Sequence, residues 1–361
     1  SYCIADIQLI AATGQTIAVL EGVHLKPAKP ELLVSQFPQL QDWLYQVEWR
    51  IQPRNTDSTI SGSLLSPAAI HDRLSPQLST LLTQPDLISY AKLLPQLESL
   101  SLTYILRAFQ QLYGTFYPGQ YFSTAQLIRQ LEIAPQQQRL FSRLLEILEE
   151  ADILQRQDDQ WHVVQLPEDL NPELQTQQLL THDAIASAEL VLLQRCGSQL
   201  AAVLLGQTEP LQLLFPNGDL TDAVRLYQES PGSTLMNTLV QQIITLVSQH
   251  KSSGQSLRCL EIGAGTGGTT AYLLPHLDAA TTEYVFTDVS PLFVGRAKQT
   301  FKKYSCVQYQ VLNIEQSPDA QGFSQSYDIV IAANVLHATR NIREAIAHIQ
   351  QLLAPGGLLV L

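Results

Sequence analysis

The sequence predicts an α/β fold, with an open parallel sheet in the C-terminal third of the chain and a longer, mostly helical region before it. From residue 257 onward, apolar strand-like runs alternate with amphipathic segments, which is typical of parallel sheets. A glycine-rich turn at residues 263–268 joins the first strand to a helix, the junction at which open sheets bind nucleotide-like ligands. Between residues 75 and 183, apolar residues recur three and four positions apart, as they do in helices.

The chain has 361 residues with 45% apolar content, enough material for two or three globular domains. No segment reaches the roughly 18 to 20 apolar residues of a membrane span, and residues 1–6 lack the basic stretch of a signal peptide. The cysteines lie far apart without metal-ligand spacing, so neither disulfides nor a metal site is expected. A net charge of -12 disfavours nucleic-acid binding. We therefore expect a cytoplasmic protein that binds neither a membrane nor a nucleic acid.

Residues 1–30 are interpreted as the end of a domain that precedes the main body of the chain. Alternating apolar residues at 4–10 and 17–25 predict the two strands of a hairpin. Two strands do not form a stable domain by themselves, and residues 26–30, with two lysines and two prolines, have the composition of a linker. We assign residues 31–74 to that linker and expect the sequence to be a fragment of a longer polypeptide.

Residues 75–250 are expected to form a helical lid or substrate domain. A winged-helix pattern lies within it, with helices at 101–112, 123–131 and 138–148 followed by a hairpin at 153–164. In a DNA-binding protein the recognition helix of such a unit enters the major groove. Here that helix carries two cations, Arg139 and Arg143, and acidic residues follow it. A packing or lid module is therefore the favoured interpretation.

Residues 251–361 are expected to form the ligand-binding core. The carboxyl ends of its parallel strands should lie at one edge of the sheet, so the residues that end or follow them are candidate ligand contacts. The sequence ends within the fifth strand, so we expect the sheet to be truncated there. The predicted strands occupy residues 257–262, 283–288, 307–312, 327–333 and 358–361, and the predicted helices occupy residues 268–277, 291–301 and 342–353.

The glycine turn matches two patterns equally well. Gly263, Gly265 and Gly268 satisfy the G-x-G-x-x-G of dinucleotide sites, whereas Gly263, Gly265 and Gly267 satisfy the G-x-G-x-G of enzymes that use S-adenosylmethionine (SAM). Glu261 distinguishes the two, because a carboxylate repels a pyrophosphate but attracts the sulfonium and ammonium groups of SAM. The sequence therefore predicts SAM as the cofactor and a Rossmann-like class I SAM-methyltransferase sheet.

Three further residues at strand ends are candidate cofactor contacts. Asp288 ends the second strand, where an acid can accept hydrogen bonds from both ribose hydroxyls. Asn313 follows the third strand, and its side-chain oxygen could accept from the adenine amino group. Asn334 follows the fourth strand at the same edge. With Glu261 and the glycines, these residues form the predicted SAM site.

Four motifs of the core, in order, resemble the C-methyltransferase domain of modular type I polyketide synthases, and we expect a bacterial source. Two breaks in the preceding helical region are similar to the same family, and residues 1–30 are similar to the last hairpin of its dehydratase domain. The motifs are LEIGAGTGG (260–268), FTDVS (286–290), NVLHAT (334–339) and APGG (354–357), and the breaks are LQLLFP (211–216) and YQESPG (227–232).

The resemblance implies SAM-dependent methylation of the α-carbon of a β-ketoacyl chain, carried on the phosphopantetheine arm of an acyl carrier protein. The implied partners are that carrier protein and the neighbouring synthase domains. His337 is the implied base for the α-proton, since histidine side chains titrate near neutral pH. The family pairs this histidine with a glutamate, expected just beyond Leu361. Tyr227 and Asn237 are candidate contacts to the substrate or its enolate.

Two other functions remain as alternatives. An O- or N-methyltransferase for a small diffusible acceptor would need neither a carrier protein nor a dehydratase hairpin at residues 1–30. An inactive methyltransferase-like spacer between synthase domains would have no use for Glu261, Asp288 and His337, which are all present.

Overall fold

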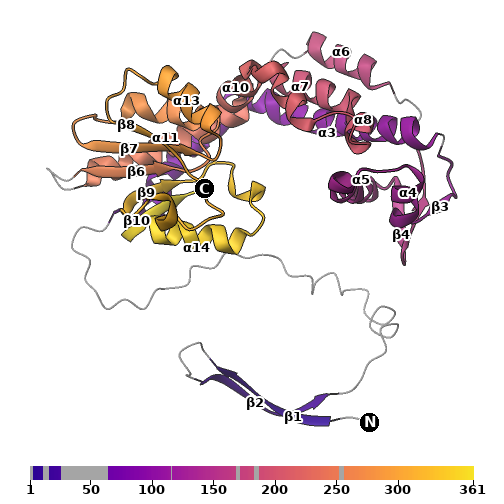
Figure 1. Ribbon diagram of the computed structural model, residues 1–361, viewed down its shortest axis with the longest axis horizontal. Helices are drawn as coiled ribbons and strands as arrows, with labels where there is room; N and C mark the ends of the chain where they lie inside the picture. The colour runs from indigo at the N-terminus through magenta and orange to yellow at the C-terminus, as the bar shows by residue number, and fades with distance from the viewer. Residues whose placement is uncertain are drawn as a thin grey trace. The chain divides into compact units, whose positions relative to one another are not determined.

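The computed structural model describes residues 3–10, 16–25, 64–114, 116–167, 171–182, 187–251 and 256–361, and the chain divides into two compact units, Ser1–Thr59 and Ile60–Leu361 (Figure 1). In the first unit, β1 (Cys3–Ile10) pairs antiparallel with β2 (Thr16–Leu25), which confirms the predicted hairpin. Residues 31–63 of the predicted linker lie outside the described residues.

Helices form most of the described chain between residues 67 and 250. Proline occupies the first turn of several of them, where its missing N–H leaves no hydrogen bond unmade. Ser66 and Ser230 cap two helices by accepting from the backbone N–H groups of Ala69 and Ser233. The helices are α2 (Pro67–Leu82), α3 (Pro85–Tyr113), α6 (Pro172–His182), α7 (Ser187–Ser198), α8 (Leu200–Leu204), α9 (Pro210–Leu214), α10 (Thr221–Gln228) and α11 (Pro231–His250), with a 3-10 turn η4 (Pro216–Gly218).

Helical structure begins at Pro67, inside the range assigned to the linker, so the expected boundary at residue 75 is not a structural one. Ile70 and Leu74 of α2 are buried against Ile244 and Val247 of α11. Burial of these apolar side chains makes α2 part of the packed domain. Ser66 as the cap and Pro67 in the first turn are the pattern that marks this helix start.

The winged-helix pattern is confirmed between α3 and α6. Its sheet has the order β3-β5-β4, and its core is built on Phe109, Phe141 and Leu145, all fully buried. Arg143, one of its two candidate DNA-contacting cations, is bonded to Glu146 and Glu150 at 3.2 and 2.7 Å. The elements are β3 (Tyr121–Phe122), α4 (Thr124–Gln130), η2 (Pro135–Gln137), α5 (Gln138–Glu150), β4 (Leu154–Gln157) and β5 (Gln160–Val163).

The C-terminal core is a parallel sheet with the strand order β10-β9-β6-β7-β8 (Figure 1). The chain runs outward from β6 in one direction and then returns to its other side, so a topological switch point lies between β6 and β9. This arrangement confirms the predicted class I SAM-methyltransferase fold. The strands are β6 (Leu257–Glu261), β7 (Thr282–Asp288), β8 (Val307–Val311), β9 (Tyr327–Ile331) and β10 (Leu353–Val360).

Helices cover both faces of this sheet, because successive strand residues point to opposite sides. Cys259 of β6 packs on the side of α11, and its neighbour Leu260 packs on the side of Ile349 in α14. The predicted helix at 268–277 ends earlier, at Leu273, and continues as a 3-10 turn that contains Pro275. The remaining elements are α12 (Gly268–Leu273), η5 (Leu274–His276), α13 (Pro291–Thr300), η6 (Asp319–Gln321), η7 (Leu336–Ala338) and α14 (Ile342–Leu352).

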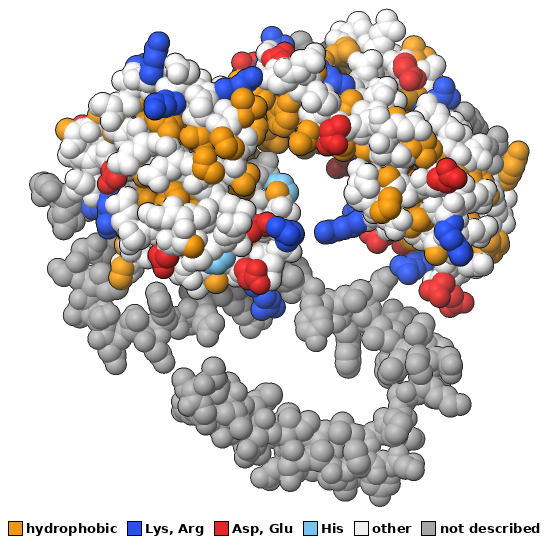
Figure 2. All heavy atoms as spheres, in the orientation of Figure 1, with side chains coloured by type: hydrophobic (Ala, Val, Ile, Leu, Met, Phe, Trp, Pro, Cys, Tyr) orange, Lys and Arg blue, Asp and Glu red, His pale blue; other side chains and the backbone are white. Residues whose placement is uncertain are grey.

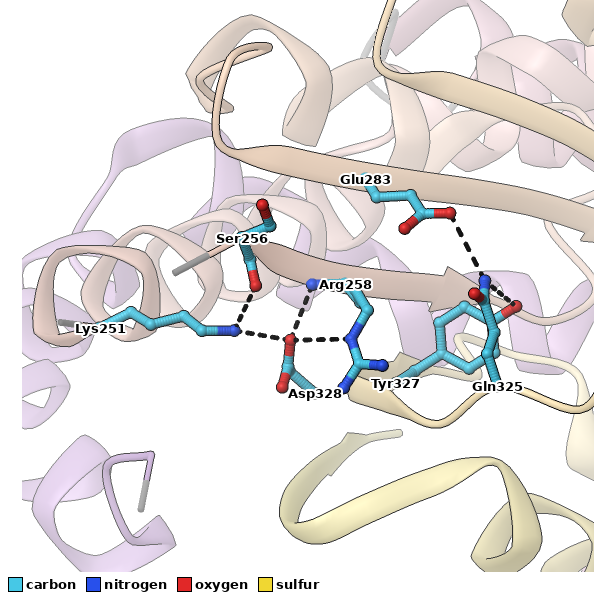
Figure 3. A network of polar contacts seen from close by, with 7 residues as sticks. All are labelled: Lys251, Ser256, Arg258, Glu283, Gln325, Tyr327 and Asp328. Atoms are coloured by element: carbon cyan, nitrogen blue, oxygen red, sulfur yellow. Dashed lines mark hydrogen bonds and ion pairs between the residues drawn. The ribbon is translucent and has the colours of Figure 1, made fainter. Parts of the chain in front are cut away.

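A polar network fixes the amino ends of the strands, at the edge away from the glycine turn (Figure 3). Asp328, near the start of β9, accepts from Lys251 Nζ at 2.6 Å and from the Arg258 backbone N–H at 2.8 Å. The same ammonium donates to the Ser256 carbonyl at 2.6 Å. The network therefore joins the end of α11 to the first residues of β6 and β9.

Candidate functional site

The glycine turn after β6 has a backbone that requires glycine. Gly263, Gly265 and Gly267 have φ values of 60°, 54° and 78°, in the left-handed region that favours glycine. A Cβ on Gly263 would lie 2.3 Å from Val335 Cγ2, and one on Gly267 would lie 2.7 Å from the Phe301 ring. The turn therefore needs these glycines for conformation and for space.

Gly268 lines the cavity beside the glycine turn, and the prediction left it out of the SAM site. A Cβ there would lie 2.8 Å from the Tyr227 carbonyl oxygen and 3.2 Å from Tyr227 Cβ. The end of α10 thus packs directly on the start of α12, and both flank the turn. The competing G-x-G-x-x-G pattern contained this glycine, so the signal was present in the sequence.

Asp288 links the glycine turn to the end of β7 through side-chain hydrogen bonds. Its Oδ2 accepts from the Gly265 backbone N–H at 2.9 Å, and its Oδ1 accepts from the Ser290 N–H at 2.8 Å. The side chain is buried, yet each carboxylate oxygen can accept a further hydrogen bond. This acid therefore orders the turn, and its contact with the ribose stays a prediction.

Glu261 ends β6 as a buried carboxyl, 2% exposed, in the wall of a cavity. Its Oε2 accepts from the hydroxyl of Tyr284 at 2.6 Å and from the hydroxyl of Thr270. Burial raises the pKa of this carboxyl to about 7, although both hydrogen bonds act to lower it. Neither Tyr284 nor Thr270 was recognised from the sequence; Tyr284 lies in register with Cys259 on the adjacent strand.

The cavity has a volume of about 800 Å³ and lies between the glycine turn and the helical region. Of the predicted residues, it brings together Glu261, Gly263, Gly265, Asn334, Tyr227 and Asn237. Its apolar wall was not predicted and includes Phe215, Leu226, Met236, Val240 and Phe293. Figure 2 shows further hydrophobic side chains on the surface around α10 and α13; Val289 and Leu292 are among the exposed ones.

Four predicted site residues, Gly267, Asp288, Asn313 and His337, do not line the cavity. Asn313 is engaged locally, because its Oδ1 accepts from the Glu315 N–H at 3.0 Å and its backbone bonds to Gln321. His337 lies on η7 as an exposed residue, three positions after Asn334. Asn334 has a φ of 54°, an unusual value for a residue with a side chain.

Asn237 joins three helices beside the cavity. Its Nδ2 donates to the Tyr227 carbonyl at 2.9 Å, and its Oδ1 accepts from the Thr269 hydroxyl at 2.9 Å. Both ends of the amide are therefore used within the protein, which holds α10 and α11 against α12. Tyr227 itself is 42% exposed.

Comparison with known proteins agrees with this geometry. Residues 260–359 match a family model described as a methyltransferase domain. The crystal structure of the CurJ carbon methyltransferase is 44% identical in sequence, with a TM-score of 0.79, over 82% of this chain and 79% of that one. The chain belongs to the carbon methyltransferase family.

Other relatives of this carbon methyltransferase are parts of polyketide synthases. The carbon methyltransferase domain of the citrinin polyketide synthase is 28% identical with a TM-score of 0.72, over 83% of this chain and 80% of that one. The non-reducing polyketide synthase nvfA of Aspergillus novofumigatus is 37% identical over 281 residues, 74% of this chain. The chain spans 12% of that synthase. The curated relatives compared here are fungal, so they do not support the bacterial source we expected.

SAM is the methyl donor of this family. A related structure, the trans-methyltransferase CalH, was solved in complex with SAH. CalH is 25% identical in sequence, with a TM-score of 0.52, over 73% of this chain and 69% of that one. The residues of the methyltransferase fit this cofactor. The cavity volume lies within the range for small-molecule sites, roughly 300–1,000 Å³. A carboxyl in its wall, Glu261, suits the positive charges of SAM, and the side-chain-free turn leaves space beside it.

Among the described residues, no helix has the length and apolar character needed to cross a bilayer. The same residues contain no group of three or more His, Cys, Asp or Glu side chains placed to hold a metal ion.

Proposed function

We propose that this domain transfers a methyl group from SAM to the α-carbon of a β-ketoacyl chain that is attached through phosphopantetheine to an acyl carrier protein. The observation that carries the proposal is the single cavity in which the glycine turn and Glu261 meet an apolar wall. An acyl chain is apolar, so Phe215, Met236 and Phe293 suit it as neighbours. The likeness to carbon methyltransferases points to carbon as the acceptor atom.

SAM supplies an electrophilic methyl group. Glu261 and the glycines of the turn are the proposed contacts to its methionine part, and Asp288 and Asn313 are the proposed contacts to its ribose and adenine. Asn334 completes the set, because it lies in the cavity wall after β9. Strand-end residues of an open sheet are placed to do this together.

His337 is the proposed base. The α-proton of a β-ketoacyl thioester is acidic because two carbonyl groups flank it, and an imidazole nitrogen can accept that proton. The position of His337 after β9, at the carboxyl edge of the sheet, supports this role. Because its ring lies outside the cavity wall, the acceptor must reach toward η7 for the transfer. Tyr227 and Asn237 remain proposed contacts to the acceptor. Asn237 also holds α10 against α12 through its hydrogen bonds to Tyr227 and Thr269.

The wider setting belongs to the same proposal. Residues 1–30 would be the end of a dehydratase-like domain, and the residues from 31 to the start of α2 would be a linker. The helices from α2 to α11 would form a lid or substrate domain over the methyltransferase core, residues 251–361, in the cytoplasm. The polyketide synthase relatives support such neighbours.

The test is incubation with SAM and a β-ketoacyl carrier protein, with the mass of the acyl group followed. We expect a gain of one methyl group and its loss in His337→Ala, while SAM affinity is retained. Methylation of a small alcohol or amine, with none of the acyl group, would instead identify an O- or N-methyltransferase. SAM binding without any methyl transfer across several acyl lengths would contradict the proposal. An unchanged rate in His337→Ala would remove the base assignment.

A further inference from the structure

A tyrosine from the helical region reaches the cavity. Tyr90 belongs to the first turns of α3, outside the SAM-methyltransferase core, and lines the same cavity as Glu261. Its ring packs on the first turn of α11, since a Cβ on Gly232 would lie 3.3 Å from Tyr90 Cε1 and 3.7 Å from its hydroxyl oxygen. Because Gly232 has no side chain, the Tyr90 ring can occupy this position in the cavity wall.

A carboxyl and a hydroxyl flank the Tyr90 phenol, Glu189 from α7 and Ser230 at the cap of α11. Burial and then the negative charge of Glu189 raise the pKa of Tyr90 to about 12, against a smaller lowering by the Ser230 hydroxyl. The phenol therefore stays protonated at neutral pH and can serve as a hydrogen-bond donor.

Both carboxylate oxygens of Glu189 are shielded from solvent, and neither makes a hydrogen bond of good geometry to a described residue. Glu189 is nevertheless near enough to Tyr90 for its charge to raise the pKa of the phenol. A carboxylate can accept about four hydrogen bonds, and leaving a buried one unsatisfied costs about 1–3 kcal/mol or more. Glu189 thus has unused acceptor capacity next to a residue of the cavity wall.

Several other polar groups of the wall already make hydrogen bonds within the protein. The amide of Asn237 is bonded at both ends, and Ser230 donates to Ser233 at 3.1 Å. One oxygen of Glu261 is occupied by two hydroxyls. Tyr90, backed by Glu189, is therefore a polar group of the wall that is free to engage a ligand.

We propose that Tyr90 and Glu189 form a subsite that binds an N–H or O–H donor of a ligand in the cavity, with Tyr90 in contact with the ligand and Glu189 positioning Tyr90. When the Tyr90 hydroxyl donates a hydrogen bond to Glu189, the lone pairs of the phenol oxygen are left to accept from the ligand. The inference rests on the proposed function, because that function supplies the two ligands that could carry such a donor. One source is the ammonium of SAM, and the other is an amide N–H of the pantetheine arm.

The first test compares Tyr90→Phe with Tyr104→Phe. Tyr104 is a matched control, because it is a fully buried tyrosine of the same helix whose hydroxyl bonds to Thr176 at 3.1 Å, outside the cavity. Dissociation constants are measured by calorimetry for SAM and for a β-ketoacyl pantetheine. We expect Tyr90→Phe to weaken the binding of one of these ligands by about three- to tenfold, and Tyr104→Phe to leave the binding of both unchanged.

The ligand that weakens identifies the source of the donor. If both dissociation constants stay within twofold of wild type in Tyr90→Phe, or rise equally in Tyr104→Phe, the subsite does not exist and Tyr90 only packs. Both readouts are binding constants, so they decide the subsite even if methyl transfer to the acyl group fails and the proposed function is lost.

The second test examines the positioning role of Glu189. Glu189→Gln keeps an acceptor oxygen and should bind the affected ligand within about threefold of wild type, whereas Glu189→Leu should lose as much affinity as Tyr90→Phe. The double variant Tyr90→Phe/Glu189→Leu should be no weaker than either single variant, because the two residues act as one unit. Losses that multiply in the double variant would show independent effects and overturn the pairing.

Discussion

The hydroxyl of Tyr284 donates a 2.6 Å hydrogen bond to Oε2 of Glu261 across two adjacent strands of the sheet. The Thr270 hydroxyl, from the helix after the glycine turn, donates to the same oxygen. Glu261 Oε1 receives no hydrogen bond from a described residue, and the side chain lines the cavity. One edge of the carboxyl is thus held by the protein while the other is left for a ligand, in a setting where burial raises its pKa to about 7.

The first prediction concerns the pH dependence of SAM binding. A cationic ligand prefers ionised Glu261, so SAM should lower the pKa of this carboxyl and release a proton when it binds near pH 7. The dissociation constant should rise about tenfold between pH 8 and pH 6. Calorimetry in buffers of different ionisation enthalpy checks both effects. Glu261→Gln is the control and should bind weakly at every pH; a pH-independent affinity in the wild-type protein would contradict the assignment.

The second prediction concerns stability without ligand. A carboxyl whose pKa is raised by folding favours the folded state below its unfolded value of 4.5, and this contribution is lost as pH rises through about 7. Glu261→Gln removes the cost of ionising the buried group, so it should stabilise the ligand-free protein at pH 8 by on the order of 1–3 kcal/mol. Chemical denaturation at pH 8 and pH 4 measures this, and the gain should nearly vanish at pH 4, below the unfolded pKa. If Glu261→Gln were less stable than wild type at pH 8, the hydrogen bonds from Tyr284 and Thr270 to the ionised carboxylate would outweigh the cost of burying its charge.

The parts of this site that follow from the sequence are those set by local pattern. A buried parallel strand reads as an apolar run, so β6 and β9 were located within two residues of their ends. Glu261 and Asn334 were identified because such strands end at one edge, and the cavity contains both. The charge of Glu261 was also enough to choose between the two glycine patterns, because a carboxylate next to the turn would repel a pyrophosphate and attract the positive groups of SAM.

The parts that did not follow depend on tertiary contacts or on local side-chain bonding. Tyr90 enters the cavity from a helix about 170 residues upstream of Glu261, because α3 packs on α11. The local bond of Asn313 was not predicted either: its Oδ1 accepts from the N–H of Glu315, two residues further along the chain, as asparagine side chains often do in turns. Strand β10 begins at Leu353 instead of residue 358, since Leu353 pairs with Tyr327 ahead of the proline and glycines. Such pairing is decided by the neighbouring strand.

The third prediction concerns the glycine turn. Gly263→Ala places a Cβ 2.3 Å from Val335 Cγ2 at a φ of 60°, so the turn must move. We expect SAM affinity to fall more than tenfold and stability to fall by about 3 kcal/mol. Gly322→Ala is the matched control, because its φ of 87° is also positive but no atom lies within 4 Å. That variant should lose only about 1–2 kcal/mol and keep its SAM affinity. Equal losses of affinity in both would mean that crowding against Val335 plays no part.

The last prediction concerns the network at the amino ends of the strands. Asp328 and Lys251 are bonded at 2.6 Å, and their side chains are 16% and 12% exposed (Figure 3). Asp328→Ala therefore leaves the nearly buried Lys251 ammonium with one partner, the Ser256 carbonyl. It also leaves the Arg258 backbone N–H without its hydrogen bond. We expect a loss of about 2–4 kcal/mol in urea denaturation. SAM affinity should stay within twofold, because the network lies at the edge opposite the glycine turn. Arg340→Ala removes an ion pair of an arginine that is 90% exposed and should cost under about 1 kcal/mol. If Asp328→Ala cost no more than Arg340→Ala, the network would not be what holds α11 to the sheet.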